Sequence, residues 1–537
     1  MTFGNISLGL LCLGGSLAMP GTVPAADYYV SSGGADASAG TAEAAAWKSI
    51  ARVNAASFRP GDRVLFQAGR DFPGNLRLGA NSAGRSNAPV VITSFGAGRA
   101  RLRSGGETGI TVENAGWVTI SNLVVVGDGA TNNTGYGVRF ENGLEGFQRL
   151  EGVRVEAVEA CGFGMFGLFI SGRQAGFEHV RIVGCDLHDN LRAGIEISGR
   201  LDWNSPLYAH ADVEVRRCRA HDNSGDPLYV KNHSGSGMVL YQVDGGRVAD
   251  CRAWGNGRLC RQANGGVGIW ACASRGVVIE RCESFENRTG GGDGGGFDLD
   301  GGSTDCVLQY NYTHDNDGPG LLVYTYRYAS HSDRGNVVRF NVSDHDSRKT
   351  RTYAGLWVRN DGNGMTGLKV YNNTVRMGPW SDQAAYVDGN GVEAEFHHNL
   401  LVGGAQTAAL RVEHPVATLR FQHNLYWGEG SPLRIRWGES EFGTLAAWEQ
   451  ATGQEVVGGK ALGLCADPQF GGVQAAARTP SEDWRARLTA FQPLRGSVAL
   501  NTGAESAPEA TASGADIMGN VLSPTKWPIG AVGTGSL

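Results

Sequence analysis

Short runs in which apolar and polar residues alternate recur along most of this chain, separated by Gly, Asn and Asp. Three clear runs are VEVRR at 213–217, PLYVK at 227–231 and MVLYQV at 238–243. Alternation with a period of two predicts β-strands, because successive side chains of a strand point to opposite faces. The segment AEAAAWKSIARVNAA at 42–56 has a helix-like pattern instead. The pattern therefore predicts an all-β chain with a short helical segment near its N-terminus.

A ladder of matched positions recurs through the middle of the chain at nearly constant spacing. Its members are Cys185, Cys218, Cys251, Cys282, Asn311, Asn341 and Asn372. The steps between them, by subtraction, are 33, 33, 31, 29, 30 and 31 residues. Such a fixed period indicates stacked repeats, in which each unit buries its apolar side against its neighbours. Three short strands and three turns within each period fit one coil of a parallel β-helix.

A second column follows five residues after the ladder positions: Asn190, Asn223, Asn256, Asn287, Asn316 and Asp346. We expect these side chains to stack at one inward turn and to bond the adjacent coil, since buried polar groups need partners. We interpret the ladder cysteines as small buried hydrophobic residues, because zinc sites need close spacing such as C-x₂-C. A local disulfide among Cys260, Cys272 and Cys306 is left open.

Composition narrows the class of protein. The 537 residues include 82 glycines, 19% are charged and 41% are hydrophobic, which is typical of a globular, turn-dense chain. A net charge of −6 without a polybasic stripe gives no argument for nucleic acid as a partner. The apolar run from Ile6 to Met19, followed by small residues, predicts a signal peptide at 1–26. We expect a secreted or periplasmic monomer without a membrane span.

Segments near both ends resemble a known superfamily. YYVSSGGADASAG, FRPGDRVLFQAGRDFPGNLRL and APVVITSFGAGRARL resemble the N-terminal cap and first coil of secreted bacterial right-handed parallel β-helix proteins of the pectin-lyase-like superfamily. GTLAAWEQATGQEV, ADPQF, GSVALNTGA and WPIGAVG resemble the tail that closes these proteins. The resemblance implies a right-handed parallel β-helix of about ten or more coils. Because the superfamily includes lyases, glycoside hydrolases, epimerases and non-catalytic adhesins, it does not define the reaction.

The predicted organisation follows from this resemblance. Residues 27–110 form an N-terminal cap and the first coils, residues 111–431 form the β-helix, and residues 432–537 form a C-terminal coil with an irregular capping tail. Caps are needed because open strand edges at the ends of the stack invite aggregation.

Aligning the strand after each Asn-column turn sorts its side chains into two faces. The alignment uses Gly194, Pro227, Gly268, Gly296, Gly320 and Gly355. The inward face is then Ile195, Ile197, Leu228, Val230, Ile269, Ala271, Phe297, Leu299, Leu321, Val323, Leu356 and Val358. The outward face carries Glu196, Tyr229, Lys231, Trp270, Asp298, Asp300, Leu322, Tyr324, Trp357 and Arg359. Aromatic faces stack on sugar rings, and acidic and basic groups bind sugar hydroxyls and carboxylates. The predicted substrate-binding residues are therefore Glu196, Tyr229, His233, Trp270 and Trp357.

Two acidic residues on this face suggest catalysis. Asp298 and Asp300, in GGDGGGFDLDGG, lie two residues apart on one strand, with roughly 6–7 Å between their Cα atoms. Like charges so close need a cation, a raised pKa or solvent. In a hydrolase, one carboxyl would protonate the leaving oxygen and the other would activate water or attack carbon. A second alternative, a lyase, is described below, and a third is that both residues lie on a solvated face of a turn-rich coil without function.

In a lyase, Asp293, Asp298 and Asp300 would help to hold Ca²⁺. Lys231 would abstract the C5 proton of a uronate, with assistance from Tyr324 or Arg359. This arrangement resembles β-helix lyases that combine a lysine base with an acidic calcium site. The sequence lacks both the NTD, DD and GHG set of polygalacturonases and a compact DDG-type calcium motif. The residues of neither family are therefore transferred as a set.

The cationic groups of Lys231, His233 and Arg359 suit an acidic polymer. We therefore expect a polysaccharide lyase that cleaves a uronate-containing glycan by β-elimination, with Ca²⁺ as its cofactor. The alternatives are a glycoside hydrolase that uses Asp298 and Asp300, and a non-catalytic glycan-binding surface protein or adhesin.

A third column lies three residues after the ladder positions: His188, His221, Trp254, Phe285 and His314. Adjacent coils place such residues about 4.8 Å apart, so His188 and His221 could share a ligand. We favour a structural stack of rings for this column.

Overall fold

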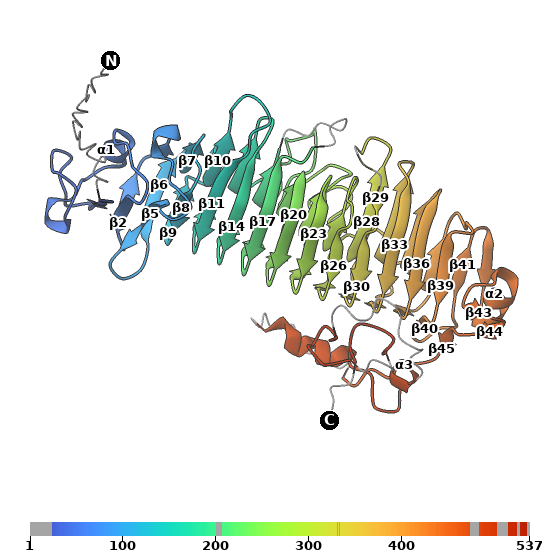
Figure 1. The fold of residues 1–537 in the computed structure, drawn as a ribbon. Helices are drawn as coiled ribbons and strands as arrows, with labels where there is room; N and C mark the ends of the chain where they lie inside the picture. The colour runs from blue at the N-terminus through green and yellow to red at the C-terminus, as the bar shows by residue number, and fades with distance from the viewer. Residues whose placement is uncertain are drawn as a thin grey trace, which may run out of the picture.

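The computed structural model describes residues 24–199, 207–329, 331, 333–472, 483–501, 514–522 and 527–533. The apolar run of the predicted signal peptide lies outside these residues. Within them, three long sheets wind along one axis, and each coil contributes one strand to each sheet (Figure 1). The sheets contain 15, 14 and 14 strands among the described residues, and nearly all pairings are parallel. This arrangement confirms the predicted parallel β-helix and its number of coils.

Sheet A runs in the order β1 (Asp27–Val30), β2 (Arg63–Gln67), β5 (Val90–Phe95), β8 (Val118–Ser121), β11 (Leu150–Glu156), β14 (Phe177–Val183), β17 (His210–Arg216), β20 (Val243–Ala249), β23 (Arg275–Glu280), β26 (Val307–Gln309), β30 (Val337–Arg339), β33 (Met365–Tyr371), β36 (Val392–His397) and β39 (Leu419–Gln422). The short strand β29 (Asp333–Arg334) pairs with β33 beside this path.

Sheet B runs in the order β3 (Asp71–Pro73), β6 (Ala100–Gly105), β9 (Leu123–Gly127), β12 (Glu159–Cys161), β15 (Asp186–His188), β18 (Arg219–His221), β21 (Arg252–Trp254), β24 (Glu283–Phe285), β27 (Tyr312–His314), β31 (Val342–Asp344), β34 (Thr374–Arg376), β37 (Leu400–Gly403), β40 (Leu425–Gly428) and β45 (Leu464–Cys465).

Sheet C runs in the order β4 (Leu76–Leu78), β7 (Ile110–Glu113), β10 (Val138–Asn142), β13 (Phe166–Gly172), β16 (Ala193–Ser198), β19 (Ser236–Tyr241), β22 (Ile269–Cys272), β25 (Phe297–Leu299), β28 (Leu321–Tyr326), β32 (Ala354–Asp361), β35 (Gln383–Gly389), β38 (Ala408–Val412), β41 (Ile435–Trp437) and β42 (Ser440–Phe442), of which β42 is antiparallel to β41.

The polar columns hold neighbouring coils in register. The side-chain amide of Asn190 donates to Asn223 (Nδ2 to Oδ1, 3.1 Å), and this pattern continues to Asp346, which accepts from Asn316 at 2.8 Å. The prediction for this column is confirmed. The ladder cysteines are buried and free, and Cys260, Cys272 and Cys306 are also free, so no disulfide links those three residues.

The ladder differs from the prediction near its end. Asn341 donates to Asn373 rather than to Asn372, and the column then continues through Asn399 and Asn424. Asn372 instead adopts a left-handed backbone conformation with φ 52°, at the turn one residue earlier. The sequence analysis placed this ladder position at Asn372 instead of Asn373, because two asparagines are adjacent there.

Both ends of the stack are covered. At the N-terminal end, η1 (Glu43–Ala45) and α1 (Ile50–Asn54) place Trp47, Ile50 and Val53 against the first coils, and η2 (Ala80–Ser82) follows β4. At the other end, Trp448 of α2 (Leu445–Thr452) is fully buried and its ring packs near Phe421. The small hairpin of β43 (Val456–Val457) and β44 (Lys460–Ala461) follows α2.

The C-terminal tail flanks the middle coils rather than capping the last one (Figure 1). Its elements are η3 (Trp484–Phe491) and α3 (Val498–Asn501). Trp484 and Phe491 pack against Tyr312 of β27, with ring centroids 6.1 Å apart in both cases. The predicted capping role of 432–537 therefore belongs to the segment around α2, because the later residues bury their apolar side chains on the side of the helix.

One predicted strand is wrong. Leu228 and Val230, assigned to the inward face, are 86% and 68% exposed and lie in a loop. The strand of that coil is β19, whose Met238 and Leu240 are fully buried. The loop between β18 and β19 carries a strand-like alternation, PLYVK, that does not face the core. Tyr229 and Lys231 consequently do not belong to sheet C.

Candidate active site

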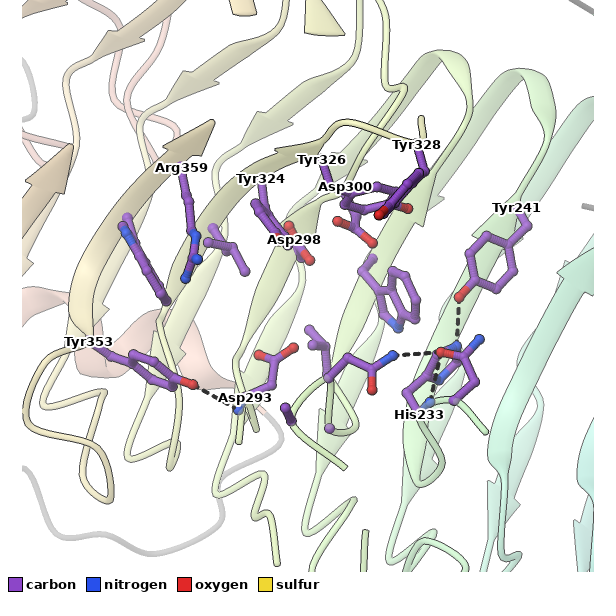
Figure 2. Close-up of a pocket in the computed structure, with 18 residues that line it drawn as sticks. His233, Tyr241, Asp293, Asp298, Asp300, Tyr324, Tyr326, Tyr328, Tyr353 and Arg359 are labelled. Atoms are coloured by element: carbon purple, nitrogen blue, oxygen red, sulfur yellow. Dashed lines mark hydrogen bonds between the residues drawn. The ribbon is translucent and has the colours of Figure 1, made fainter. Parts of the chain in front are cut away.

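A cavity of about 580 Å³ opens on the outer face of sheet C in the middle of the helix. Its walls come from β19, β22, β25, β28 and β32 and from the loops before them. The residues that line it are Asn232, His233, Tyr241, Ala263, Asn264, Gly265, Val267, Trp270, Asp293, Asp298, Asp300, Leu322, Tyr324, Tyr326, Tyr328, Tyr353, Trp357 and Arg359. Aromatic rings and acidic groups surround one hollow (Figure 2), as in sites that bind small ligands.

Asp298 is held in an apolar environment by the stacking of the coils. Strand register places it directly between Trp270 of β22 and Leu322 of β28, and it is only 4% exposed. Burial, followed by the charges of Asp300 and Asp293, raises the pKa of Asp298 well above its usual value. Asp298 is therefore expected to carry its proton at neutral pH.

Asp293 and Asp300 approach the same cavity from different elements. Asp300 follows β25, whereas Asp293 lies in the glycine-rich loop before that strand (Figure 2). Burial and the charge of Asp300 raise the pKa of Asp293 to about 8. Burial raises the pKa of Asp300 to about 7, although hydrogen bonds from Gly301 and Cys272 oppose the shift. Of the three carboxyls, Asp300 is thus the one that ionises most readily near neutral pH.

Several buried polar atoms of this cavity lack hydrogen-bond partners among the described residues. They are Oδ1 of Asp293, Asp298 and Asp300, Nε1 of Trp357 and Nδ1 of His233. Unsatisfied buried groups are uncommon in folded proteins and each costs free energy. Their concentration in one cavity indicates that a polar ligand or water completes their bonding.

Three other polar side chains of the cavity already have hydrogen-bond partners. The Tyr324 hydroxyl donates to Asp361 at 2.6 Å, and Nε of Arg359 donates to the other oxygen of Asp361 at 3.0 Å. Burial and this hydrogen bond to Asp361 raise the pKa of Tyr324. Nε2 of His233 bonds the Tyr241 hydroxyl at 2.6 Å, and burial lowers the pKa of His233 to about 4. His233 is therefore neutral, and Tyr324 keeps its proton.

A second hollow of about 620 Å³ continues the groove toward later coils. It shares Tyr324, Tyr326, Tyr328 and Arg359 with the first cavity. Beyond them it is lined by Arg327, Asn360, Asp361, Gly362, Asp388, Gly389, Asn390 and His414. The two hollows share lining residues and together form a groove along sheet C.

The structure assembles part of the predicted site. Asp293, Asp298, Asp300, Tyr324, Arg359, His233, Trp270 and Trp357 all line the cavity. Lys231 is exposed in the loop before β19 and does not line it. Tyr229 lies in the same loop, where the guanidinium of Arg192 covers its ring at 3.5 Å. Glu196 is on the predicted face of β16 but outside the cavity, and burial raises its pKa to about 7.

The three cavity carboxylates do not converge on one point. A single Ca²⁺ with ligands at about 2.3–2.6 Å requires ligand atoms within about 5 Å of one another. Among the described residues, no set of one oxygen each from Asp293, Asp298 and Asp300 lies within 4.8 Å. Among the described residues these three carboxyls form no preformed group for one ion, and the calcium site stays a prediction.

Sequence reasoning found three of the aromatic residues of the cavity but missed Tyr241, Tyr326, Tyr328 and Tyr353. Tyr241 and Tyr326 lie on β19 and β28, so correct strand alignment alone could have placed them. For β19 the signal was present, since Gly237 continues the glycine column and a Cβ there would lie 2.3 Å from the Gly268 carbonyl oxygen. Tyr328 and Tyr353 come from loops, and no periodicity in the sequence predicts their positions.

Comparison with known proteins agrees with this fold. The family model described as the right-handed β-helix region matches residues 162–375. A GH136 lacto-N-biosidase from Eubacterium ramulus has a similar structure, with a TM-score of 0.51 and 16% identity over 69% of this chain and 66% of that chain. A pectate lyase structure aligns over 96% of this chain and 97% of its own, with 16% identity and a TM-score of 0.45. The chain has the fold of a right-handed parallel β-helix.

A sequence relative is the lacto-N-biosidase of Bifidobacterium longum subsp. longum. It is 23% identical over 483 residues, which cover 71% of this chain and 29% of the relative. The chain thus spans less than a third of that protein's length. Within the part of the chain that the structure describes, no helix is long and apolar enough to cross a membrane.

Proposed function

We propose that this protein is a glycoside hydrolase that cleaves a neutral glycan bound along sheet C. The observation that carries the proposal is the set of three carboxyls with raised pKa values, each with an oxygen that lacks a partner, around one aromatic cavity. Hydrolysis of a glycosidic bond needs one protonated and one ionised carboxyl on either side of that bond. Groups whose environments separate their pKa values are the usual basis for such assignments.

The environments suggest a role for each carboxyl. Asp293, with a pKa near 8, keeps its proton at neutral pH and acts as the general acid on the leaving oxygen. Asp300 has the lowest pKa of the three, so it acts as nucleophile or base. Asp298 stays neutral between Trp270 and Leu322 and positions the substrate.

The residues predicted to carry out elimination are not placed to do so in this geometry. Lys231 lies outside the cavity, in a loop that leaves its side chain exposed. The Tyr324 hydroxyl donates to Asp361, and Arg359 is paired with the same carboxylate. Proton abstraction from C5 of a uronate would therefore need a rearrangement of these contacts.

The charges of the groove favour a neutral substrate over an acidic one. In the described residues, the lining of both hollows includes five acidic residues, Asp293, Asp298, Asp300, Asp361 and Asp388, and four basic residues, His233, Arg327, Arg359 and His414. Arg359 is already paired with Asp361 at 3.0 Å. A polyuronate would bring further negative charge to a groove in which Arg327 is the one arginine without a carboxylate partner among the described lining residues, which costs binding energy.

The two lacto-N-biosidases named above support the same direction. Both lacto-N-biosidases bear the name of an enzyme that acts on a glycoside, and one is assigned to GH136. The seven aromatic side chains of the cavity suit the apolar faces of sugar rings.

We also propose that the protein is exported, on the basis of the apolar run at its N-terminus.

The experiment is a panel of neutral and acidic oligosaccharides and polysaccharides, followed for new reducing ends and for the ultraviolet absorbance of unsaturated uronates. The proposal predicts reducing ends from a neutral glycan, no rise in absorbance, and loss of product with Asp300→Asn. Absorbance that rises together with reducing ends on a uronate polymer would establish elimination and refute the proposal. Binding without any product would favour a glycan-binding protein.

A further inference from the structure

A cluster of metal-binding side chains lies on sheet B, away from the cavity on sheet C. It consists of Glu159 and Cys161 on β12 and His188 on β15. One potential ligand atom of each lies within 4.8 Å of the other two, the one such group of three among the described residues. The cluster lies at the start of the column of rings that begins with His188, and it plays no part in the proposed hydrolysis.

The fold brings these three groups to one point. Glu159 and Cys161 are two residues apart on a strand and therefore share a face. Parallel pairing places Cys161 directly beside His188 of the next coil. All three side chains are partly buried, and the side chains of Glu159 and His188 are 26% and 20% exposed. The site is thus reachable by an ion from solvent.

The histidine is oriented as metal ligands usually are. Its Nδ1 lies 2.7 Å from a carboxylate oxygen of Asp189, which can only accept, so the proton resides on Nδ1 and Nε2 carries a lone pair. The ring of His221 stacks behind it with centroids 4.9 Å apart and fixes its plane. A carboxylate that holds the distal ring nitrogen is the common outer partner of a metal-bound histidine.

His188 and His221, two of the three histidines of this column, differ in the partners of their ring nitrogens. His221 uses both ring nitrogens, Nδ1 toward Asp222 at 2.8 Å and Nε2 toward Asp186 at 3.1 Å. In His188, Nε2 faces Glu159 Oε1 at 3.9 Å, beyond hydrogen-bond distance. A structural ring stack accounts for His221, as expected from the sequence, but leaves Nε2 of His188 without a role.

The two carboxylate oxygens of Glu159 also have different partners. Its Oε2 accepts from Arg99 at 2.6 Å, which fixes the carboxylate, while Oε1 points toward His188. The arrangement leaves one carboxylate oxygen, one imidazole nitrogen and one sulfur for an ion. Thiolate, imidazole and carboxylate together form a donor set that suits Zn²⁺ better than Ca²⁺ or Mg²⁺.

We propose that Glu159, Cys161 and His188 bind one Zn²⁺ ion, which links two adjacent coils of sheet B and keeps one coordination position for water. Binding replaces the proton of the Cys161 thiol by the metal and releases that proton to solvent. The ion stabilises the stack between β12 and β15, because the unfolded chain does not hold these groups together. It takes no part in catalysis on sheet C.

The test is titration of the reduced, chelator-treated full-length protein with Co²⁺, which replaces Zn²⁺ and gives absorption bands. The proposal predicts a sulfur-to-cobalt charge-transfer band that saturates at one ion per chain and disappears when Zn²⁺ is added. Cys161→Ser abolishes the band, and His188→Gln weakens Co²⁺ binding at least about tenfold, in line with loss of a ligand. Cys465→Ser is the matched control, since Cys465 is an exposed cysteine elsewhere and its variant keeps the band.

Thermal unfolding gives a second result that does not depend on cobalt. Zn²⁺ raises the Tm of the wild-type protein and of Cys465→Ser but leaves that of Cys161→Ser unchanged. Circular dichroism verifies that each variant folds, and Cys161→Ser keeps the glycosidase activity of the wild type. Absence of a charge-transfer band in the reduced wild-type protein, or an unchanged band in Cys161→Ser, would overturn the proposal.

Discussion

At the scale of single residues, the proposed function depends on how differently three similar carboxyls are placed. Asp298 lies between two apolar neighbours, Asp293 comes from a loop, and Asp300 receives hydrogen bonds that favour its ionised form. Burial is the largest cause of the raised pKa in all three cases. The same amino acid can therefore serve as acid, base and neutral partner within one cavity.

Replacing each carboxyl in turn by an amide should distinguish these roles. Asp293→Asn and Asp300→Asn should each lower kcat by about 10³-fold, because general acid–base or nucleophilic action is lost. Asp298→Asn should lower kcat by less than about 10²-fold, because Asp298 is already uncharged. Steady-state rates on the best glycan of the panel measure these values. A loss that is largest for Asp298→Asn would contradict the assignment.

The same carboxyls make stability depend on pH. A carboxyl whose pKa is raised by folding keeps its proton in the folded state, so its contribution is complete below the unfolded pKa and is lost as pH rises through the folded pKa. We therefore expect Tm to fall between about pH 4 and pH 8, the latter being the pKa to which Asp293 is raised.

Asp298→Asn should raise Tm at pH 8 by about 2 °C or more and have little effect at pH 4, because it removes a group that resists ionisation. Differential scanning calorimetry at the two pH values measures both. A Tm change of equal size at the two pH values would show that packing, rather than ionisation, is responsible.

At the scale of strands and turns, the glycine column allows the coils to stack closely. A Cβ at Gly237 would lie 2.3 Å from the Gly268 carbonyl oxygen, whereas a Cβ at Gly33 would meet nothing within 4 Å. Gly237→Ala should therefore destabilise the protein by about 1–3 kcal/mol, as overpacking of a core does. Denaturant unfolding measures this effect, with Gly33→Ala as the control. Equal stability of the two variants would refute the role of the column.

The repeating elements could be predicted from the sequence because each coil uses the same residue at the same place. Cys185 and Asn190 define columns that need no knowledge of the loops, and Asp298 was found by alternation along β25. Lys231 was misplaced because its loop contains an alternating segment, and alternation does not show which face the core covers. Tyr328 and Tyr353 depend on the paths of long turns, which local patterns do not determine.

At the scale of the whole molecule, the β-helix presents one continuous face on which successive coils add parts of a groove. The cavity and the second hollow follow each other along sheet C, and the tail packs near β27 of sheet B. The proposed catalytic site therefore lies on one side of the stack, whereas the proposed metal site lies on another.

Chelation tests this separation. Treatment with EDTA should leave kcat unchanged, because the cavity carboxylates do not surround one calcium ion. The same treatment should lower Tm if the protein carries zinc at Cys161. Rate and Tm measured on one sample distinguish the two effects. Loss of activity that Ca²⁺ restores would contradict the proposed mechanism.

The central claim is that the glycosidic bond is broken by water. The most direct measurement is mass spectrometry of products formed in water enriched in heavy oxygen, with a neutral oligosaccharide of defined structure as substrate. The account predicts one heavy oxygen atom at each new reducing end and product masses that sum to substrate plus one water. Products without heavy oxygen, with masses that sum to the substrate alone, would show elimination and contradict it.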